Sequence, residues 1–127
     1  MRTAEEIYQK SLAVLGEKDG EETASFRRRA VGLINVLCAQ CRELDCALKG
    51  EAYDPMKETA SIDGLACEVD ATEPVLLSLL PLGLAGYLIL EEAPSRAAEL
   101  LARFEREKEL LRMRGRRGRR HKIRRPY

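Results

Sequence analysis

Four cysteines are the residues of this chain whose type and spacing most invite chemistry: Cys38, Cys41 and Cys46, followed at a distance by Cys67. A Cys-x-x-Cys pair with further thiols downstream is compatible with a structural zinc site. However, the first three thiols fall within one long predicted helix, whereas zinc-binding pairs usually occupy tight turns. A buried free cysteine behaves as a small apolar residue. We therefore expect packing roles and no metal or other cofactor, and a zinc-stabilised interaction module is kept as an alternative.

His121 is the only histidine, and it lies in a basic stretch near the C-terminus. A general base needs a shaped pocket and an orienting partner, and the neighbouring sequence supplies neither. The chain also has no Gly-rich phosphate loop, no nucleophile elbow and no metal-binding His-Glu helix motif. We therefore predict a protein that is not an enzyme, with no catalytic, cofactor-binding or metal-binding residues.

The strongest electrostatic feature is the C-terminal arm, which we define as residues 112–127. Arginine suits phosphate because its planar guanidinium can donate two hydrogen bonds at once. A run of like charge stays extended and often serves as an interaction tail. Because Tyr127 is the only aromatic residue of the arm, base stacking and sequence-specific readout are not predicted. The candidate contacts with DNA or with a protein partner are Arg112, Arg114, Arg116, Arg117, Arg119, Arg120, Lys122, Arg124 and Arg125.

The net charge of +1 conceals a strong partition along the 127 residues. Residues 1–111 carry 13 basic and 21 acidic side chains, so 13 − 21 gives −8, whereas residues 112–127 carry +9. We predict one helical domain over residues 1–111, which is long enough to bury a core without disulfides or metals. Residues 112–127 are expected to form a flexible arm, because Gly115 and Gly118 discourage helix.

The composition favours helix over strand, since Ala, Leu, Glu and Arg are abundant while Val, Ile and Thr are sparse. Thr3 and Glu6 form a capping box that predicts a helix over residues 4–15, and Gly16 is a natural stop. No segment shows the alternation typical of strands.

A second, longer helix is predicted to begin at Thr23 or Ser25 as the N-cap and to end at Gly50. Its apolar residues follow steps of three and four, the spacing of one helix face. Residues 50–72 show no sustained period and are predicted to be a long loop, which in a small domain is often functional. The apolar stripe is Phe26, Ala30, Leu33, Leu37, Cys41, Leu44 and Leu48.

Residues 75–90 form a run without a single charge and are predicted to be the central helix of the fold. Pro81 lies inside this run, where it removes an intrahelical hydrogen bond and predicts a kink. Gly83 and Gly86 allow a neighbouring helix to approach closely. Because the run is shorter than the ~20 residues that span a bilayer, we expect a buried helix and not a membrane span.

A fourth helix is predicted from Pro94, with Ser95 as its N-cap, to about residue 111. Together the elements predict an all-α, four-helix domain with a kinked central apolar helix, a long loop between helices 2 and 3, and a basic C-terminal arm. The polar N-terminus does not read as a secretory signal, so we expect the thiols to stay reduced in a cytosol. The expected apolar face of the fourth helix is Ala97, Leu100, Leu101, Phe104 and Leu111.

Several short segments carry a likeness to a known family: Leu15-Gly16-Glu17, Leu33-Ile34-Asn35, Ser61-Ile62-Asp63, Leu80-Pro81-Leu82-Gly83-Leu84-Ala85, Leu88-Ile89-Leu90-Glu91 and Phe104-Glu105. Their order resembles the small head–tail connector proteins, or head-completion adaptors, of tailed bacteriophages and prophages, over about residues 1–112. Members of that family often have Tyr where this chain has Leu82 and Phe104. The Arg-rich arm is not part of the resemblance.

The resemblance implies a structural role without catalysis. Copies would form an oligomeric ring around the DNA channel, joining the portal and head to the tail after DNA packaging. The implied partners are the portal protein and other head-completion or tail proteins, with the 50–72 loop and the termini as assembly surfaces. The implied location is the head–tail junction of the virion, and the host cytoplasm during assembly, where an isolated copy is compatible with a monomer. The arm alone supports an alternative, a small cytosolic protein that binds nucleic acid non-specifically.

Overall fold

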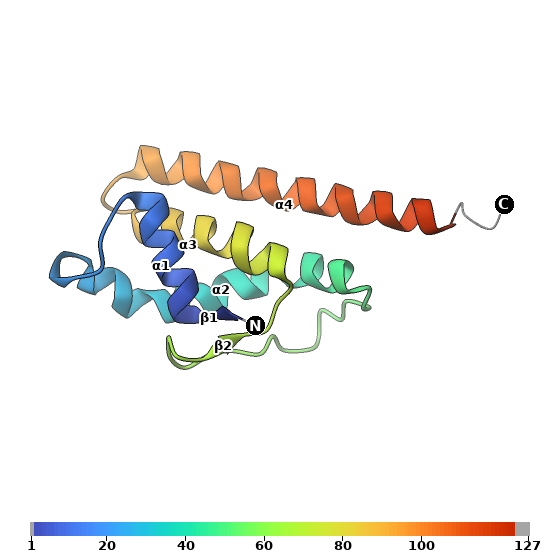
Figure 1. The fold of residues 1–127 in the computed structure, drawn as a ribbon, viewed down its shortest axis with the longest axis horizontal. Helices are drawn as coiled ribbons and strands as arrows, with labels where there is room; N and C mark the ends of the chain where they lie inside the picture. Colours follow the sequence, from blue (N-terminus) through green and yellow to red (C-terminus); the bar gives the residue numbers. More distant parts are fainter. Residues whose placement is uncertain (1, 124–127) are drawn as a thin grey trace.

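The computed structural model describes the backbone of residues 2–123 and the surroundings of side chains up to residue 115. Four α-helices dominate the fold (Figure 1), which confirms the predicted all-α class. A two-stranded sheet of two residues per strand is an addition that the sequence did not predict. The elements in chain order are β1 (Arg2–Thr3), α1 (Ala4–Leu15), the 3₁₀ turn η1 (Glu21–Thr23), α2 (Ala24–Lys49), β2 (Glu68–Val69), the π-helical segment η2 (Val75–Leu79), α3 (Leu80–Leu88) and α4 (Pro94–Ile123).

Helix α1 begins and ends where its capping residues predict. The Thr3 side chain accepts a hydrogen bond from the Glu6 amide at 3.3 Å, as expected for an N-cap. Gly16 follows the helix with a φ of 73°, a left-handed conformation that glycine adopts without the strain a Cβ would add. Local chemistry alone therefore accounts for both ends of this helix.

Helix α2 ends as predicted but begins without the predicted cap. Gly50 terminates it with a φ of 75°, in the same way that Gly16 ends α1. Thr23 occupies the N-cap position but makes no capping hydrogen bond. Its hydroxyl instead accepts from the Gly20 amide at 3.0 Å, which closes the η1 turn. Ser25 lies inside the first turn of α2, so neither residue caps the helix as expected.

The segment from η2 to α3 is the centre of the hydrophobic core, as predicted. Every residue of α3 except Tyr87 is buried. In η2 the hydrogen bonds reach back five residues, so the Leu80 amide donates to the Val75 carbonyl. Pro81, which has no amide hydrogen to donate, then falls in the first turn of α3. The π-helical turns therefore lie immediately before the proline.

Two glycines set the distance between α3 and its neighbours. A Cβ added at Gly83 would lie 2.7 Å from Cδ2 of Leu37 in α2 and 3.0 Å from ring carbons of Phe104 in α4. A Cβ added at Gly86 would lie 2.8 Å from the Leu101 side chain in α4. All of these distances are shorter than an ordinary carbon–carbon contact. The close helix approach predicted from these glycines is therefore present.

Helix α4 begins at Pro94 as predicted, but Ser95 lies within its first turn and does not precede the helix as a cap. It continues through Gly115 and Gly118 to Ile123, whereas we expected helix to stop near residue 111. The cost of a glycine inside a helix is only about 1 kcal/mol, and the surrounding arginines and Met113 are good helix formers. Of the helices in residues 2–123, none is long and apolar enough to cross a membrane.

Candidate functional site

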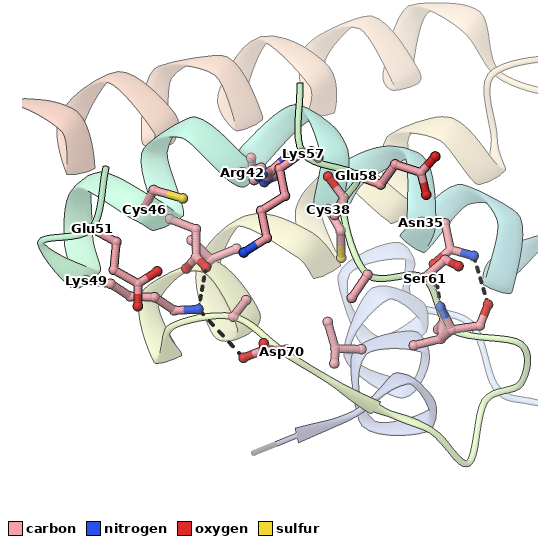
Figure 2. Close-up of a pocket in the computed structure, with 18 of the residues that line it drawn as sticks. Asn35, Cys38, Arg42, Cys46, Lys49, Glu51, Lys57, Glu58, Ser61 and Asp70 are labelled. Carbon is pink, nitrogen blue, oxygen red and sulfur yellow. Dashed lines mark hydrogen bonds and ion pairs between the residues drawn. The ribbon is translucent and has the colours of Figure 1, made fainter. Parts of the chain in front are cut away.

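We call the connection between α2 and η2 the 50–72 loop. Asn35, near the middle of α2, attaches this loop to the helix. The Asn35 side-chain amide donates to the Ile62 carbonyl, and its Oδ1 accepts from the Ile62 amide, both at 2.9 Å (Figure 2). One side chain thus provides the pair of hydrogen bonds that a neighbouring strand would give. The contact fixes the loop on α2 over a sequence distance of 27 residues.

A second attachment lies at the end of the loop, at Asp45 of α2. This largely buried carboxylate accepts hydrogen bonds from both the amide and the hydroxyl of Thr72 at 2.8 Å. Lys49 Nζ lies 3.1 Å from Asp45 and 3.6 Å from Asp70. The hydrogen bond to Asp45 is the largest contribution that raises the pKa of Lys49 above its ordinary value. Asp45 therefore positions the residue from which the central helical segment starts.

The same loop also satisfies the N-terminus of α1. The amides of Ala4 and Glu5 donate to the carbonyls of Cys67 and Leu65 at 2.9 and 2.8 Å. These are among the first amides of the helix, which have no partner within it. Strands β1 and β2 pair antiparallel just beside them, with Arg2 opposite Val69. The part of the loop from residue 62 onward is thus held from both α1 and α2.

Residues 51–61 of the loop, which we call the loop flap, are much more exposed than the rest. Met56 has 88% of its surface in solvent, the largest value among the exposed large hydrophobic residues that the structure describes. The flap contacts α2 through Arg42, whose guanidinium donates to the Lys57 carbonyl. The same guanidinium lies 5.5 Å from the centre of the Tyr53 ring, a cation–π arrangement. One arginine therefore holds a strongly exposed segment against α2.

A groove of about 340 Å³ lies between α2 and the loop. Figure 2 shows Lys57 and Glu58 of the flap opposite Cys38 and Arg42 of α2. Six acidic and three basic side chains line the groove, so it offers hydrogen bonds to a polar surface and carries an excess of negative charge. These features suit an interaction surface that forms where a loop covers a helix.

Cys38 and Cys41 are placed for packing and not for thiolate chemistry. Burial is the main cause that raises the pKa of Cys38 to about 11 and that of Cys41 to about 12, and the charge of Asp45 contributes to both increases. Both thiols are protonated at neutral pH, which makes them poor nucleophiles and poor metal ligands. All four cysteines are free. Among the residues whose side chains are described, no group of three or more His, Cys, Asp or Glu could hold a metal ion.

The predicted contact residues of the arm divide into three groups. Arg112 and Arg114 are described with their side chains, and Arg112 pairs with Glu109 at 3.0 Å on the same helix. Arg116, Arg117, Arg119, Arg120 and Lys122 lie on α4, for which only the backbone is described there. Arg124 and Arg125 lie outside the described residues. The last turns of α4 extend beyond the ends of the other helices (Figure 1).

Sequence reasoning missed the polar side chains that bind distant backbone groups. Asn35 and Asp45 are two of them. Arg29 Nη2 donates to the Leu88 carbonyl at 3.1 Å, and Arg96 Nη2 donates to the Leu15 carbonyl at 3.3 Å, so both neutralise helix C-termini. The sequence did contain one signal for Asn35 and Asp45, which is their position along α2. Each is next to a residue of the buried face of the helix, so its side chain starts close to the core.

The fold and the site together define an all-α protein of four helices whose longest connection is fixed to its first and second helices. Neither protein families nor curated proteins nor solved structures gave a match to this chain. The function is therefore inferred from the residues of the chain and their arrangement.

Proposed function

We propose that this protein joins the head and tail of a tailed bacteriophage or prophage. Several copies would form a ring around the DNA channel, in contact with the portal protein on one side and with tail-completion proteins on the other. The role is structural, and the working surface is the exterior of the helical domain. The protein acts at the head–tail junction of the virion after assembly in the host cytoplasm.

The observation that supports this proposal is the arrangement of the segments that resemble connector proteins. Residues 80–85 lie at the centre of the core, between α2 and α4. Asn35 and Ile62, from two further segments of the resemblance, are joined by two hydrogen bonds. Phe104, from the last segment, packs against the position of Gly83. Segments spread over the chain thus meet in one connected unit.

The loop flap is the assembly surface in this proposal. It presents Met56 and Tyr53 to solvent, with 88% and 42% of their surfaces exposed. Exposed apolar side chains beside a polar groove are typical of protein–protein contacts. We further propose that the π-helical turns before Pro81 bend the central helical segment, which consists of η2 and α3. This bend would set the angle at which neighbouring copies meet.

The direct experiment mixes the purified protein with DNA-filled particles that carry the portal but lack this protein. We expect the protein to sediment with the particles and to add ring-shaped density below the portal in electron micrographs. Met56→Asp combined with Tyr53→Asp should abolish this binding, because two charges would enter the contact. The control is Leu90→Asp, which adds one charge at an apolar position just after α3 that is 44% exposed.

Particles that remain free of the protein at micromolar concentration would contradict the proposal, as would equal binding by the flap variant and the wild type. Circular dichroism establishes that each variant is folded. The genes that flank this one give an independent check. Portal, protease and capsid genes directly upstream support a connector, whereas ordinary host genes would favour the nucleic-acid-binding alternative.

A further inference from the structure

The helical part of the arm, residues 112–122, has a linear charge density close to that of duplex DNA. It carries seven basic residues and no acidic one. Since α4 runs to Ile123, these positions follow one continuous helix. At a rise of 1.5 Å per residue the segment is about 15 Å long, so a positive charge occurs about every 2 Å. Duplex DNA carries one negative charge per about 1.7 Å of its axis.

The basic positions are distributed around the helix and do not form one stripe. With 3.6 residues per turn, no gap between neighbouring basic positions exceeds about 80° of the circumference. A helix that docks on a protein surface needs an apolar stripe to bury. Met113 is the one large apolar residue of the segment, and the next one, Ile123, follows ten positions later. A helix that is positive on every side suits a groove with phosphates on both walls, such as the DNA major groove.

The acidic body reaches only the base of this segment. There Glu109 pairs with Arg112, and Glu43 of α2 lines the same groove as Arg112 and Gly115. Attraction between exposed charges is screened beyond about 8 Å at physiological salt. The far half of the segment extends past the ends of the other helices (Figure 1), and by its length it lies more than a screening distance from Glu109. Its charge is therefore available to a partner.

We propose that residues 112–122 of α4 form a binding site for the sugar–phosphate backbone of double-stranded DNA, without sequence specificity. Each arginine can give a phosphate two hydrogen bonds. Binding releases counterions from the DNA, which supplies most of the affinity. This site does not depend on the connector role, because an isolated copy of the full chain carries it.

The test measures binding of the full chain to a short fluorescent DNA duplex by anisotropy, between about 50 and 200 mM salt. If each of the seven positions neutralises one phosphate, the slope of log K against log salt is about −6. Two duplexes of unrelated sequence should bind equally. An arm variant that retains three of the seven charges should show a slope of about −3 and a loss of at least about 100-fold at the lowest salt. That variant is Arg116→Gln, Arg117→Gln, Arg119→Gln and Arg120→Gln.

A matched control removes four exposed basic residues from the body, so both variants change the net charge from +1 to −3. The control should keep the wild-type slope, because its charges lie outside the site. Replacing the same four arm arginines by lysine should also keep the slope, since each position remains a point charge. The lysine variant changes the same four positions but keeps their charge. It therefore separates the loss of charge from any effect that substitution at these positions has on folding. The control substitutions are Lys10→Gln, Arg28→Gln, Arg103→Gln and Arg106→Gln.

Three results would overturn this proposal: no binding at the lowest salt, equal loss of affinity in the arm and control variants, or equally tight binding to polyglutamate. The last result would assign the arm to acidic proteins. The connector role is tested separately, because particle binding depends on the flap and is measured with the arm intact. Either proposal can therefore fail while the other stands.

Discussion

Replacing Gly83 by alanine tests whether α3 is packed as closely as its glycines indicate. The added Cβ would lie 2.7 Å from Leu37 Cδ2 and 3.0 Å from two ring carbons of Phe104. Unstrained carbon atoms are separated by about 3.5–4.0 Å, so the neighbours must move by close to 1 Å. Leu37 is 0% exposed and Phe104 is 1% exposed, so neither side chain can move into solvent.

The expected size of the effect follows from two opposing contributions. Overpacking a close-packed core costs about 1–3 kcal/mol. Alanine recovers up to about 1 kcal/mol, because glycine is the poorer helix former. We therefore expect Gly83→Ala to lower the free energy of unfolding by about 1–2 kcal/mol. Urea unfolding followed by circular dichroism measures this as a lower midpoint at an unchanged slope.

Two further glycines provide the comparison. Among the described residues, no heavy atom lies within 4 Å of a Cβ built at Gly32 of α2, so Gly32→Ala should stabilise the protein by about 0.5–1 kcal/mol. The change in the free energy of unfolding for Gly86→Ala should lie between those of Gly83→Ala and Gly32→Ala. The nearest neighbour of the added Cβ, Leu101, is only half-buried and can rotate away. A Gly83→Ala protein as stable as the wild type, beside a stabilised Gly32→Ala, would refute the packing argument.

Two other predictions concern the loop and the buried thiols. Asn35→Leu removes both hydrogen bonds to Ile62 and should lower the free energy of unfolding by about 1–3 kcal/mol. The variant should also be cleaved faster by proteases in the flap. An unchanged cleavage rate would show that Asn35 does not hold the loop. Because burial raises the pKa of Cys41 from 9.0 to about 12, the stability it contributes is complete below pH 9 and is lost as the pH rises toward 12. The free energy of unfolding of the wild type should therefore fall more steeply above pH 9 than that of Cys41→Ala, and parallel curves would count against this assignment.

The helix prediction succeeded where the deciding contacts are local. Thr3 and Gly16 bound α1 through contacts within a few residues. The periodic stripe of α2 places Phe26, Ala30 and Leu37 in the core as predicted. The charge-free run proved to be the centre of the fold because its residues have no favourable contact with water and must be enclosed by the other helices.

The prediction failed where two local preferences compete. Gly115 and Gly118 were expected to end α4, but each opposes helix by only about 1 kcal/mol, and the residues between and around them favour it. Thr23 was expected to cap α2, but its hydroxyl is already used by the η1 turn. The strands β1 and β2 had no sequence signal, since a strand of two residues is too short to show alternation.

The sequence by itself determined the four helices, both ends of α1, the C-terminus of α2, the start of α4, the buried centre and the separation of an acidic body from a basic arm. Each of these depends on residue type or on contacts between near neighbours. Only the tertiary structure decided that Asn35 binds Ile62 and that Asp45 binds Thr72, each across 27 residues. A polar side chain finds such partners only after helix packing has brought distant backbone groups within hydrogen-bond reach and removed water from around them.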